Sequence, residues 1–465
     1  MTYLVQTTLS SFKAYDIRGR VPSTLNANLA YALGRALVEV LPASTVVVGQ
    51  DARLSGPELC TALASGLQAA GARVTDIGQC GTEEIYYAAA NQPFDAGVMI
   101  TGSHNPADEN GFKIVRAGAV PVSGDSGLYD IRDRVAQYLG RSLAKTTATG
   151  ENTSFRADYV HCLLSYSGLN GYADKCRKLK VVADAGNGCA GLVLKELVPH
   201  VPFEIVPLNW EPDGHFPNGV PNPLLKERRA ATADAVRKAQ ADFGVAWDGD
   251  FDRCFLYDSL GNFIEGYYII GLLASELLRT HPGAKIVHDP RVYWNTREIV
   301  LAAGGVPVMC KTGHAFIKER MRAEDALYGG EMSAHHYFRD FAYCDSGMLP
   351  WLLIGALLLR TETTLAELVE ARMVAYPCSG EINCKVENPK KLLQAIHEHY
   401  MPKATGGDKL DGINMEFKDW RFNVRRSNTE PLVRFNVETR GNTALLEDKT
   451  SELLAFAENH DAERL

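Results

Sequence analysis

A serine and a histidine are adjacent at the end of a predicted β-strand. Residues 101–106 read Thr-Gly-Ser-His-Asn-Pro and follow the apolar run at 96–100. The Gly and Pro permit a sharp, rigid turn, so we expect the Ser103 hydroxyl on a strand-end loop, where functional groups are common. His104 could donate to a phosphate or carry a proton. Alone, such a pair is more often a capped turn than a chemical centre, and the rest of the chain must decide.

Three aspartates alternate with other residues further along the chain. Residues 248–253 read Asp-Gly-Asp-Phe-Asp-Arg and follow a second apolar run, 243–247. In an extended segment this spacing puts Asp248, Asp250 and Asp252 on one side. Clustered carboxylates repel one another unless a cation joins them, and hard oxygen ligands suit Mg²⁺ or Ca²⁺. The pattern therefore predicts a divalent-metal loop.

Residues 248–253 have two other interpretations besides that metal loop. One is a solvated acidic turn. The other is an EF-hand, which also begins Asp-x-Asp-x-Asp, but its sixth position would be Arg253 rather than Gly and its twelfth Ser259 rather than Glu. The EF-hand is therefore excluded.

A third polar loop follows the strand-like run at 326–329. Within residues 330–336, Glu331, Ser333 and His335 alternate, so an extended loop would present all three to one face. A carboxylate beside a hydroxyl suits two neighbouring sugar hydroxyls. The alternative is a buried polar strand.

A fourth loop could bind an anion. Residues 425–431 read Arg-Arg-Ser-Asn-Thr-Glu-Pro, between strand-like segments at 420–424 and 432–437 that predict a hairpin. A guanidinium, two hydroxyls, an amide and turn N–H groups make an anion cradle. The alternative is an exposed basic turn.

The four motifs, in this order, resemble those of the α-D-phosphohexomutases. Smaller matches lie at 12–19, 110–113, 212–218 and 311–314, so the resemblance covers nearly all 465 residues. The chain departs from the family where Ala334 stands in place of the usual Gly, and the second histidine, His336, has no assigned role. The run 329–338 looks most like bacterial phosphomannomutases that supply GDP-mannose for surface polysaccharides.

The resemblance implies a role for each motif. Ser103 would carry a phosphoryl group, and Asp248, Asp250 and Asp252 would hold Mg²⁺ with the Ser103 phosphate as fourth ligand. Further catalytic groups would be Arg18, His104, Lys113 and His335. Substrate contacts would come from Tyr15, Arg253, Arg291, His314, Glu331, Ser333, Arg425, Ser427, Asn428 and Thr429.

The implied reaction interconverts mannose 6-phosphate and mannose 1-phosphate. Phosphoserine would donate to the free hydroxyl, and the resulting 1,6-bisphosphate, also the expected activator, would reorient and return its other phosphate. Alternatives are a phosphoglucomutase or dual-specificity hexomutase, a metal-dependent sugar phosphatase, and a sugar-phosphate-binding protein without turnover. No motif residue is assigned to the C2 hydroxyl that distinguishes mannose from glucose.

Composition and charge limit the classes of partner that we expect the chain to bind. The net charge is −8 with no basic stripe, so we expect a phosphohexose substrate and no nucleic acid. Ten cysteines without a Cys-x-x-Cys pair indicate reduced thiols. No apolar leader is seen, and the most apolar stretch, 348–359, is too short to span a bilayer and predicts a buried helix. We expect a cytoplasmic protein without membrane contact, monomeric or weakly dimeric.

A faint internal repeat predicts the domains. Asp51, Asp184 and Asp289 each end a strand-like run, and the first three polar loops each close one such unit. Alternating strands and helices argue for parallel α/β domains. The fold prediction is three similar α/β domains with mixed, mainly parallel sheets, plus a C-terminal α+β domain, around a central cleft. The predicted boundaries are 1–150, 151–255, 256–367 and 368–465, with helices at 389–400 and near 445–458.

Overall fold

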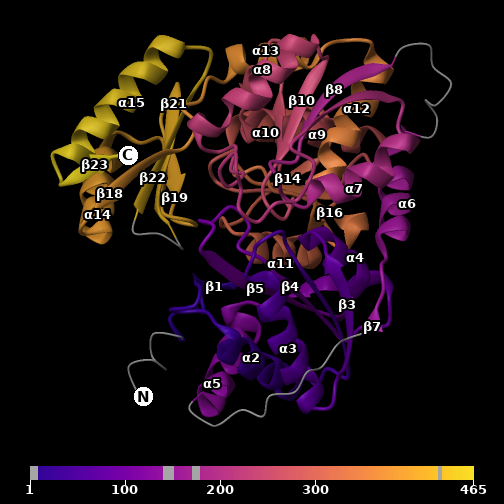
Figure 1. Ribbon diagram of the computed structural model, residues 1–465. Helices are drawn as coiled ribbons and strands as arrows, with labels where there is room; N and C mark the ends of the chain where they lie inside the picture. Colours follow the sequence, from indigo (N-terminus) through magenta and orange to yellow (C-terminus); the bar gives the residue numbers. More distant parts are fainter. Residues whose placement is uncertain (1–8, 140–150, 170–177, 428–431) are drawn as a thin grey trace. The chain divides into compact units, whose positions relative to one another are not determined.

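The computed structural model describes residues 9–139, 151–169, 178–427 and 432–465. The chain divides into two compact units. The first comprises Met1–Phe263 with Tyr337–Glu362, and the second Ile264–His336 with Thr363–Leu465. Each unit has its own sheets and buried core (Figure 1).

The first sheet of the first unit is mixed, with parallel strands at its centre. β2 pairs in parallel with β3 and β4, whereas β5 runs antiparallel to both β4 and β1. The order is β1-β5-β4-β2-β3-β7, with β6 paired to β5. The strands are β1 (Ile17–Arg20), β2 (Thr45–Gln50), β3 (Arg73–Gln79), β4 (Ala96–Ile100), β5 (Glu109–Arg116), β6 (Val120–Pro121) and β7 (Glu151–Asn152).

Helices cover both faces of this sheet, which is why its central strands are nearly continuous apolar runs. Three of the helices, α2, α3 and α5, share one hydrophobic core with the strands and lie together in Figure 1, and α4 packs on the opposite face. The helices are α2 (Ala27–Val40), α3 (Gly56–Ala69), α4 (Thr82–Asn91) and α5 (Leu128–Tyr138).

The second sheet of the first unit repeats this plan. β8 pairs in parallel with β9 and β10, and β11 runs antiparallel to β10. The strands are β8 (Leu179–Asp184), β9 (Phe203–Leu208), β10 (Phe243–Trp247) and β11 (Cys254–Tyr257), and the helices of this part are α6 (Arg156–Ser167), α7 (Ala190–Leu197), α8 (Ala230–Ala239) and α12 (Met348–Thr361). The apolar stretch predicted to be a buried helix is α12, whose side chains are almost all buried.

In the second unit, β13 pairs in parallel with β14 and β15. Its strands and helices are β13 (Lys285–His288), β14 (Val306–Met309), β15 (Tyr328–Gly330), α9 (Gly266–Thr280), α10 (Trp294–Ala302), α11 (His314–Glu324) and α13 (Leu365–Ala375). Two short strands, β12 (Phe263–Ile264) and β16 (His336–Phe338), lie where the chain passes from one unit to the other, and β17 (Cys344–Asp345) lies within the first unit.

The C-terminal sheet of the second unit is antiparallel. Its order is β19-β20-β21-β22-β18-β23, and α14 and α15 pack on one face over a shared core (Figure 1). The elements are β18 (Ile382–Val386), α14 (Pro389–Tyr400), β19 (Gly406–Asp408), β20 (Ile413–Glu416), β21 (Trp420–Arg426), β22 (Leu432–Thr439), α15 (Thr443–Glu458) and β23 (Ala462–Arg464). The predicted helices and hairpin are therefore confirmed.

The predicted repeat is real at the level of topology. In each repeat the first strand, β2, β8 or β13, pairs in parallel with the second and third strands and ends at or next to an aspartate: Asp51, Asp184 or Asp289. Each third strand leads into one of the polar loops. The predicted fold class of mixed, mainly parallel α/β domains with a C-terminal α+β domain is thus confirmed.

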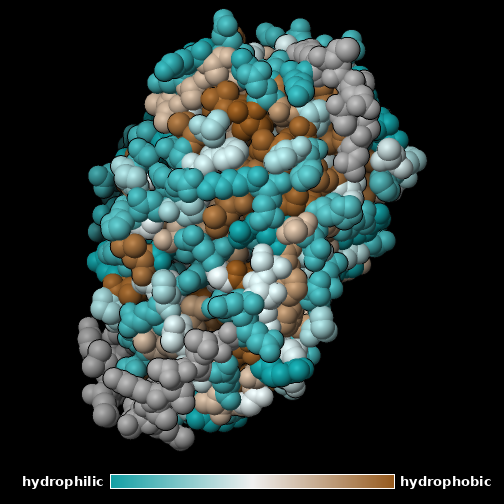
Figure 2. Space-filling view, turned by 45° about the vertical axis from the view of Figure 1, so that its right-hand side comes forward, coloured by the Kyte–Doolittle hydropathy of each residue, from teal (hydrophilic) through white to brown (hydrophobic). Residues whose placement is uncertain are grey.

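Large apolar side chains on the surface are scattered rather than gathered. Leu54, Leu260 and Val374 are each well exposed and come from different elements, and the face in Figure 2 is mostly hydrophilic with smaller hydrophobic areas. Within the described ranges, no helix combines the length and apolarity needed to cross a membrane. The cysteines of these ranges are free thiols, as predicted.

Candidate active site

The Ser103 loop follows β4 as predicted. Ser103 is buried and has a left-handed backbone conformation, with φ of 49°. Its Oγ donates to Asp248 Oδ2 at 2.8 Å and lies 3.0 Å from His104 Nδ1. The first and second motifs, 145 residues apart, therefore meet through a hydrogen bond.

The three aspartates converge, but not for the predicted reason. Residues 248–253 form a turn and loop between β10 and β11 rather than an extended segment, and Phe251 has a φ of 48°. One carboxylate oxygen from each of Asp248, Asp250 and Asp252 nevertheless lies within 4.8 Å of the others. The turn, not the period of two, brings them together.

These carboxylates fit a divalent cation. Asp248 Oδ1 and Asp250 Oδ1 are buried and have no hydrogen-bond partner within the described part of the chain, and a buried carboxylate oxygen normally has one. Burial, with repulsion from Asp252 and Asp250, raises the pKa of Asp248 to about 7. A hard cation would supply the missing partner and favour the ionised form.

Positive side chains surround the acidic cluster. Lys113 Nζ, from β5, donates to Asp250 Oδ2 at 2.7 Å and also to Asp252 Oδ2. Burial opposes its charge, but Asp250 and Asp252 raise the pKa of Lys113 above its usual value. Arg18, on β1, is paired with Asp16 at 2.7 Å and follows Tyr15 in the preceding loop. Lys113 is thus the counter-ion of the cluster.

His104 is held neutral beside the serine. Arg253 Nη2 contacts His104 Nδ1, and Arg253 Nε lies 3.2 Å from Asp248 Oδ2. Partial burial, with the positive charges of Arg253 and Arg18, lowers the pKa of His104 well below its ordinary value. A neutral imidazole next to Ser103 can accept or relay a proton.

The Glu331 loop lies in the second unit, and its predicted extended form is also wrong. Ala334 N donates to Glu331 O and Glu331 N to His335 O, which closes a turn, and Ala334 has a φ of 67°. That left-handed conformation explains why glycine is usual at this position. The turn still groups the polar side chains: His335 Nδ1 lies 3.2 Å from Ser333 Oγ and 3.6 Å from Glu331 Oε2.

A cluster of arginines surrounds one carboxylate in the second unit. Glu381 lies 2.7 Å from Arg291 Nη1, 3.4 Å from Arg425 Nη2 and 3.3 Å from Arg434 Nη1. Although burial opposes its charge, the three guanidinium groups lower the pKa of Glu381 to about 2. Arg425 lies in β21, and Ser427 immediately follows that strand. This concentration of guanidinium groups suits a phosphate.

Two predicted contacts of the phosphate loop, Asn428 and Thr429, lie outside the described residues. The histidines can be placed. The His314 ring, at the start of α11, stacks near that of His335 with a centroid distance of 6.5 Å. His336 instead lies in the core, with Nδ1 2.6 Å from the Tyr328 hydroxyl, and burial lowers its pKa to about 3. His336 is therefore a neutral core residue, separate from the polar side of its loop.

Comparison with known proteins decides the family. Four domain descriptions of phosphoglucomutase/phosphomannomutase match in order: the α/β/α domains I, II and III at residues 9–139, 157–261 and 265–376, and the C-terminal domain at 381–454. The chain belongs to the phosphoglucomutase/phosphomannomutase family. The family is one of phosphotransferase isomerases.

Curated relatives and a solved structure agree with this assignment. The chain is similar to "Phosphohexose mutases" of Xanthomonas campestris pv. campestris, with 55% identity over 96% of this chain and 98% of the relative. It is similar to "Phosphomannomutase" of Salmonella typhimurium, with 53% identity over 97% and 99%. A phosphoglucomutase/phosphomannomutase family protein of Burkholderia thailandensis aligns with a TM-score of 0.86 and 32% identity, covering 98% of this chain and 99% of that one.

Sequence reasoning missed several residues that contact the polar loops of this family member. Thr82, at the start of α4, donates from Oγ1 to Asp250 Oδ2 at 2.5 Å. Arg53 and Glu381 contact the serine loop and the arginine cluster, respectively. The sequence Asp-x-Arg occurs after two of the three repeat strands and could have indicated Arg53, but no local pattern indicates Glu381 or Thr82.

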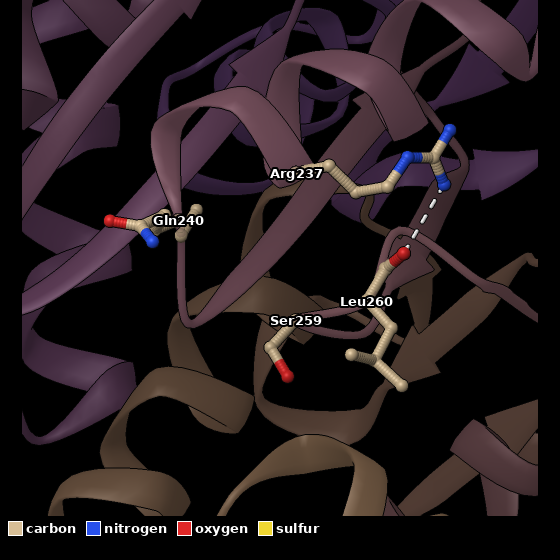
Figure 3. A pocket seen from close by; sticks show the side chains of 5 residues that line it. Arg237, Gln240, Ser259 and Leu260 are labelled. Atoms are coloured by element: carbon tan, nitrogen blue, oxygen red, sulfur yellow. Dashed lines mark hydrogen bonds between the residues drawn. The ribbon is translucent and has the colours of Figure 1, made fainter.

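A shallow hollow elsewhere on the first unit has no such chemistry. Arg237, Gln240, Ser259 and Leu260 line it, and the Arg237 guanidinium donates to Leu260 O at 3.2 Å (Figure 3). None of the predicted site residues is among its lining residues. The hollow does not compete with the Ser103 region as the candidate active site of this family member.

Proposed function

We propose that the chain interconverts mannose 6-phosphate and mannose 1-phosphate through a phosphoserine at Ser103. The observation that carries the proposal is the hydrogen bond from Ser103 Oγ to Asp248, within a cluster of three carboxylates. The relative from Salmonella typhimurium, named phosphomannomutase, matches over nearly its whole length. We further propose that the product supplies GDP-mannose for surface polysaccharide synthesis.

Phosphoryl transfer needs positioning and neutralised charge more than covalent chemistry. In the first half-reaction, the bond between phosphorus and Ser103 Oγ breaks and a bond to the sugar's free hydroxyl oxygen forms, which yields a 1,6-bisphosphate. The proton of that hydroxyl passes to a base, for which His335 is our candidate. In the second half-reaction, the other phosphate returns to Ser103, and its former sugar oxygen regains a proton.

Asp248, Asp250 and Asp252 would hold Mg²⁺, together with an oxygen of the Ser103 phosphate. When bound, the ion would neutralise charge on the transferring phosphoryl group. Lys113 pairs with two of these carboxylates, those of Asp250 and Asp252. Arg18 and His104 are proposed to orient the phosphoryl group beside Ser103.

The second unit is proposed to bind the part of the substrate that does not react. Glu331 and Ser333 would hold adjacent ring hydroxyls, which look alike after the intermediate reorients. Arg425 and Ser427 would bind whichever phosphate is idle. The remaining proposed substrate contacts are Tyr15, Arg253, Arg291, His314, Asn428 and Thr429. The boundaries of the four domains, at about 150, 255 and 367, remain a proposal.

One set of assays tests the activity. Initial rates are measured with mannose 1-phosphate and glucose 1-phosphate, with and without a catalytic amount of the matching 1,6-bisphosphate. We expect mannose 1-phosphate to be converted to the 6-phosphate, bisphosphate to raise the rate, and chelation of divalent metal to abolish it. Faster turnover of glucose 1-phosphate would identify a phosphoglucomutase, and release of free phosphate without isomerisation would identify a phosphatase.

Ser103→Ala is the companion variant. We expect it to fold normally, because a loop hydroxyl contributes little packing, and to lose on the order of a thousandfold or more in turnover, because the nucleophile is gone. Near-normal turnover by a phosphate-free Ser103→Ala preparation would refute the phosphoserine mechanism.

A further inference from the structure

Arg53 binds the backbone of the serine loop. Its guanidinium donates to four carbonyl oxygens: from Nη1 to Pro106 O and Glu109 O at 2.5 and 2.7 Å, and from Nη2 to Ser103 O and Asn105 O at 2.9 and 2.6 Å. The side chain has no solvent exposure. These carbonyls bracket the serine and the turn that follows it, so one planar side chain fixes the course of the whole loop.

Asp51 completes this arrangement. Its carboxylate accepts from Arg53 N at 2.9 Å and lies 3.3 Å from Arg53 Nε. It also accepts from Thr101 Oγ1 at 2.7 Å and from Gly102 N at 3.1 Å. Thr101 Oγ1 in turn accepts from Ser103 N at 2.8 Å. Both the N–H and the C=O of Ser103 are thus held by groups that Asp51 orients.

The fit between Arg53 and the loop leaves no space. A Cβ on Gly102 would lie 2.3 Å from Arg53 Nε, far inside van der Waals contact. Ser103 is held at a φ of 49°, a conformation that ordinary side chains disfavour. A serine released from these bonds would relax toward the common backbone regions, and its Oγ would leave the position from which it contacts Asp248.

We propose that Arg53 is a positioning residue for phosphoryl transfer, which fixes the Ser103 hydroxyl against the acidic cluster. This inference rests on the proposed phosphoserine mechanism. The guanidinium of Arg53 holds the loop that carries the nucleophile, so it acts on the transfer step rather than on substrate capture. Losing it should lower kcat and leave KM nearly unchanged.

Arg53→Lys is the main test. Lysine keeps a positive charge near Asp51, but a single ammonium with three donors cannot span four carbonyls. We expect kcat for mannose 1-phosphate to fall roughly a hundredfold, the size of effect that misplacement by about 1 Å produces, with KM within about twofold. In single-turnover experiments with the 1,6-bisphosphate, phosphorylation of Ser103, followed by mass spectrometry, should slow by the same factor.

Arg229→Lys is the matched control. Arg229 also donates to backbone carbonyls, Pro223 O at 2.8 Å and Leu224 O at 3.0 Å, but in a loop without a proposed catalytic residue. Its substitution should lower thermal stability and leave kcat and the phosphorylation rate of Ser103 unchanged. If both variants lost kcat equally, Arg53 would be a general structural residue and the inference would fail.

Thr101→Val keeps the test decisive if Arg53→Lys does not fold. Valine preserves the shape of threonine but removes the hydroxyl that links Asp51 to Ser103 N. We expect a smaller fall in kcat, again with KM nearly unchanged. Wild-type kcat in Thr101→Val or in folded Arg53→Lys, alongside an inactive Ser103→Ala, would overturn the positioning role alone. An active Ser103→Ala would refute the proposed function and the positioning role with it.

Discussion

The first and third repeats contain the same local device, an Asp-x-Arg sequence at the end of a parallel strand, with different targets. Asp51 accepts from Arg53 N at 2.9 Å and from Gly102 N at 3.1 Å. In the second unit, Asp289 accepts from Arg291 N at 2.7 Å and from Met332 N at 2.9 Å. Each aspartate therefore ties an arginine to the functional loop that closes its own repeat.

The two arginines then diverge. Arg53 lies 3.3 Å from Asp51 through Nε, but its Nη1 and Nη2 donate to neutral carbonyls of the serine loop. Arg291 instead binds Glu381 at 2.7 Å and lies 3.8 Å from Glu331 Oε1. An arginine whose partners are fixed backbone carbonyls can only hold a loop, whereas one paired with carboxylates is part of a charged cluster that can exchange partners with an anion.

The second repeat shows what remains without the arginine. Asp184 accepts from Gly186 N at 2.9 Å and from Thr232 Oγ1 at 2.7 Å. The residue two positions after Asp184 is Gly186, so this repeat has no guanidinium at the position of Arg53 and Arg291. The strand-end aspartate is thus common to the three repeats. The arginine occurs in the first and third repeats, where its partners differ.

Matched substitutions of Asp51 and Asp289 should have the largest effects and test this comparison most directly. Asp51→Asn removes the carboxylate paired with the buried Arg53 and should destabilise its unit by about 3 kcal/mol. Asp289→Asn should destabilise its unit less, because Arg291 keeps its ion pair with Glu381. We expect Asp51→Asn to lower kcat roughly a hundredfold with little change in KM. Asp289→Asn should mainly raise KM, because its loop carries the proposed sugar contacts. Steady-state kinetics and urea unfolding give these values.

The comparison would fail if the two variants changed the same kinetic parameter to the same extent. Equal losses of kcat would mean that both aspartates act only through overall stability. Measuring kcat per folded molecule, at a temperature well below each melting transition, separates the two effects.

Arg425→Ala should have the next largest effect. A mutase must bind the idle phosphate in both half-reactions, so turnover of the 1-phosphate and of the 6-phosphate should fall alike, by roughly ten- to a hundredfold for one charge-assisted contact. Escape of the bisphosphate should also increase. The exposed neighbour Arg426 on the same strand provides the control, Arg426→Ala. A loss confined to one direction would exclude a single shared phosphate site.

The counter-ions of the two units sharpen the contrast. Lys113 pairs with two carboxylates of the acidic cluster, and Glu381 pairs with three guanidinium groups of the arginine cluster. Each relieves repulsion within its cluster. Lys113 should therefore compete with a cation for the acidic cluster, and Glu381 with an anion for the arginine cluster. Such a ligand would itself relieve the repulsion within the cluster.

Glu381→Gln tests this for the arginine cluster. Removing the negative charge should strengthen competitive inhibition by inorganic phosphate several-fold, up to about tenfold, and lower KM for both sugar phosphates. Turnover should fall, because the bisphosphate must release the same cluster to reorient. Glu381→Asp, which keeps the charge, is the control. Weaker phosphate binding by Glu381→Gln would show that Glu381 organises the arginines rather than competing for them.

The positions of the polar loops could be predicted from the sequence better than their backbone conformations. The four motifs, the strand ends before three of them and the hairpin around Arg425 follow from residue types and periodicity, which are local. The extended geometry assigned to the Asp248 and Glu331 loops is wrong because single left-handed residues, Phe251 and Ala334, turn the backbone. Periodicity contains no information about such a turn.

Contacts between residues far apart in the sequence could not be predicted for another reason. Arg53 meets carbonyls about 50 residues away, and Glu381 meets Arg291 across 90 residues. Backbone carbonyls exist at every position, so no residue type reveals which of them an arginine will bind. A lone glutamate outside a motif is likewise indistinguishable from a solvated one until the fold brings its partners together.

The last comparison is between two histidines, one in the Ser103 loop and one in the Glu331 loop, and its expected effect on turnover is the smallest. His104 lies beside Ser103, whereas His336 is buried against Tyr328. The folded pKa of His336 is about 3, against about 6.5 when unfolded. Between these values the unfolded chain binds the extra proton, so stability is lost as pH falls below about 6.5, by roughly 2 kcal/mol at pH 5.

His336→Gln should remove that pH dependence. Glutamine can still accept a hydrogen bond from Tyr328, but it does not titrate, so the variant should lose about 2 kcal/mol less than the wild type between pH 7 and pH 5. Urea unfolding at the two pH values measures the difference, and the exposed His200→Gln serves as control. Turnover at pH 7 should stay within about twofold, because this histidine points into the core and away from the polar side of its loop. Equal pH slopes in wild type and His336→Gln would mean that His336 is protonated in the folded state, and a large loss of turnover would return it to the active site with His104.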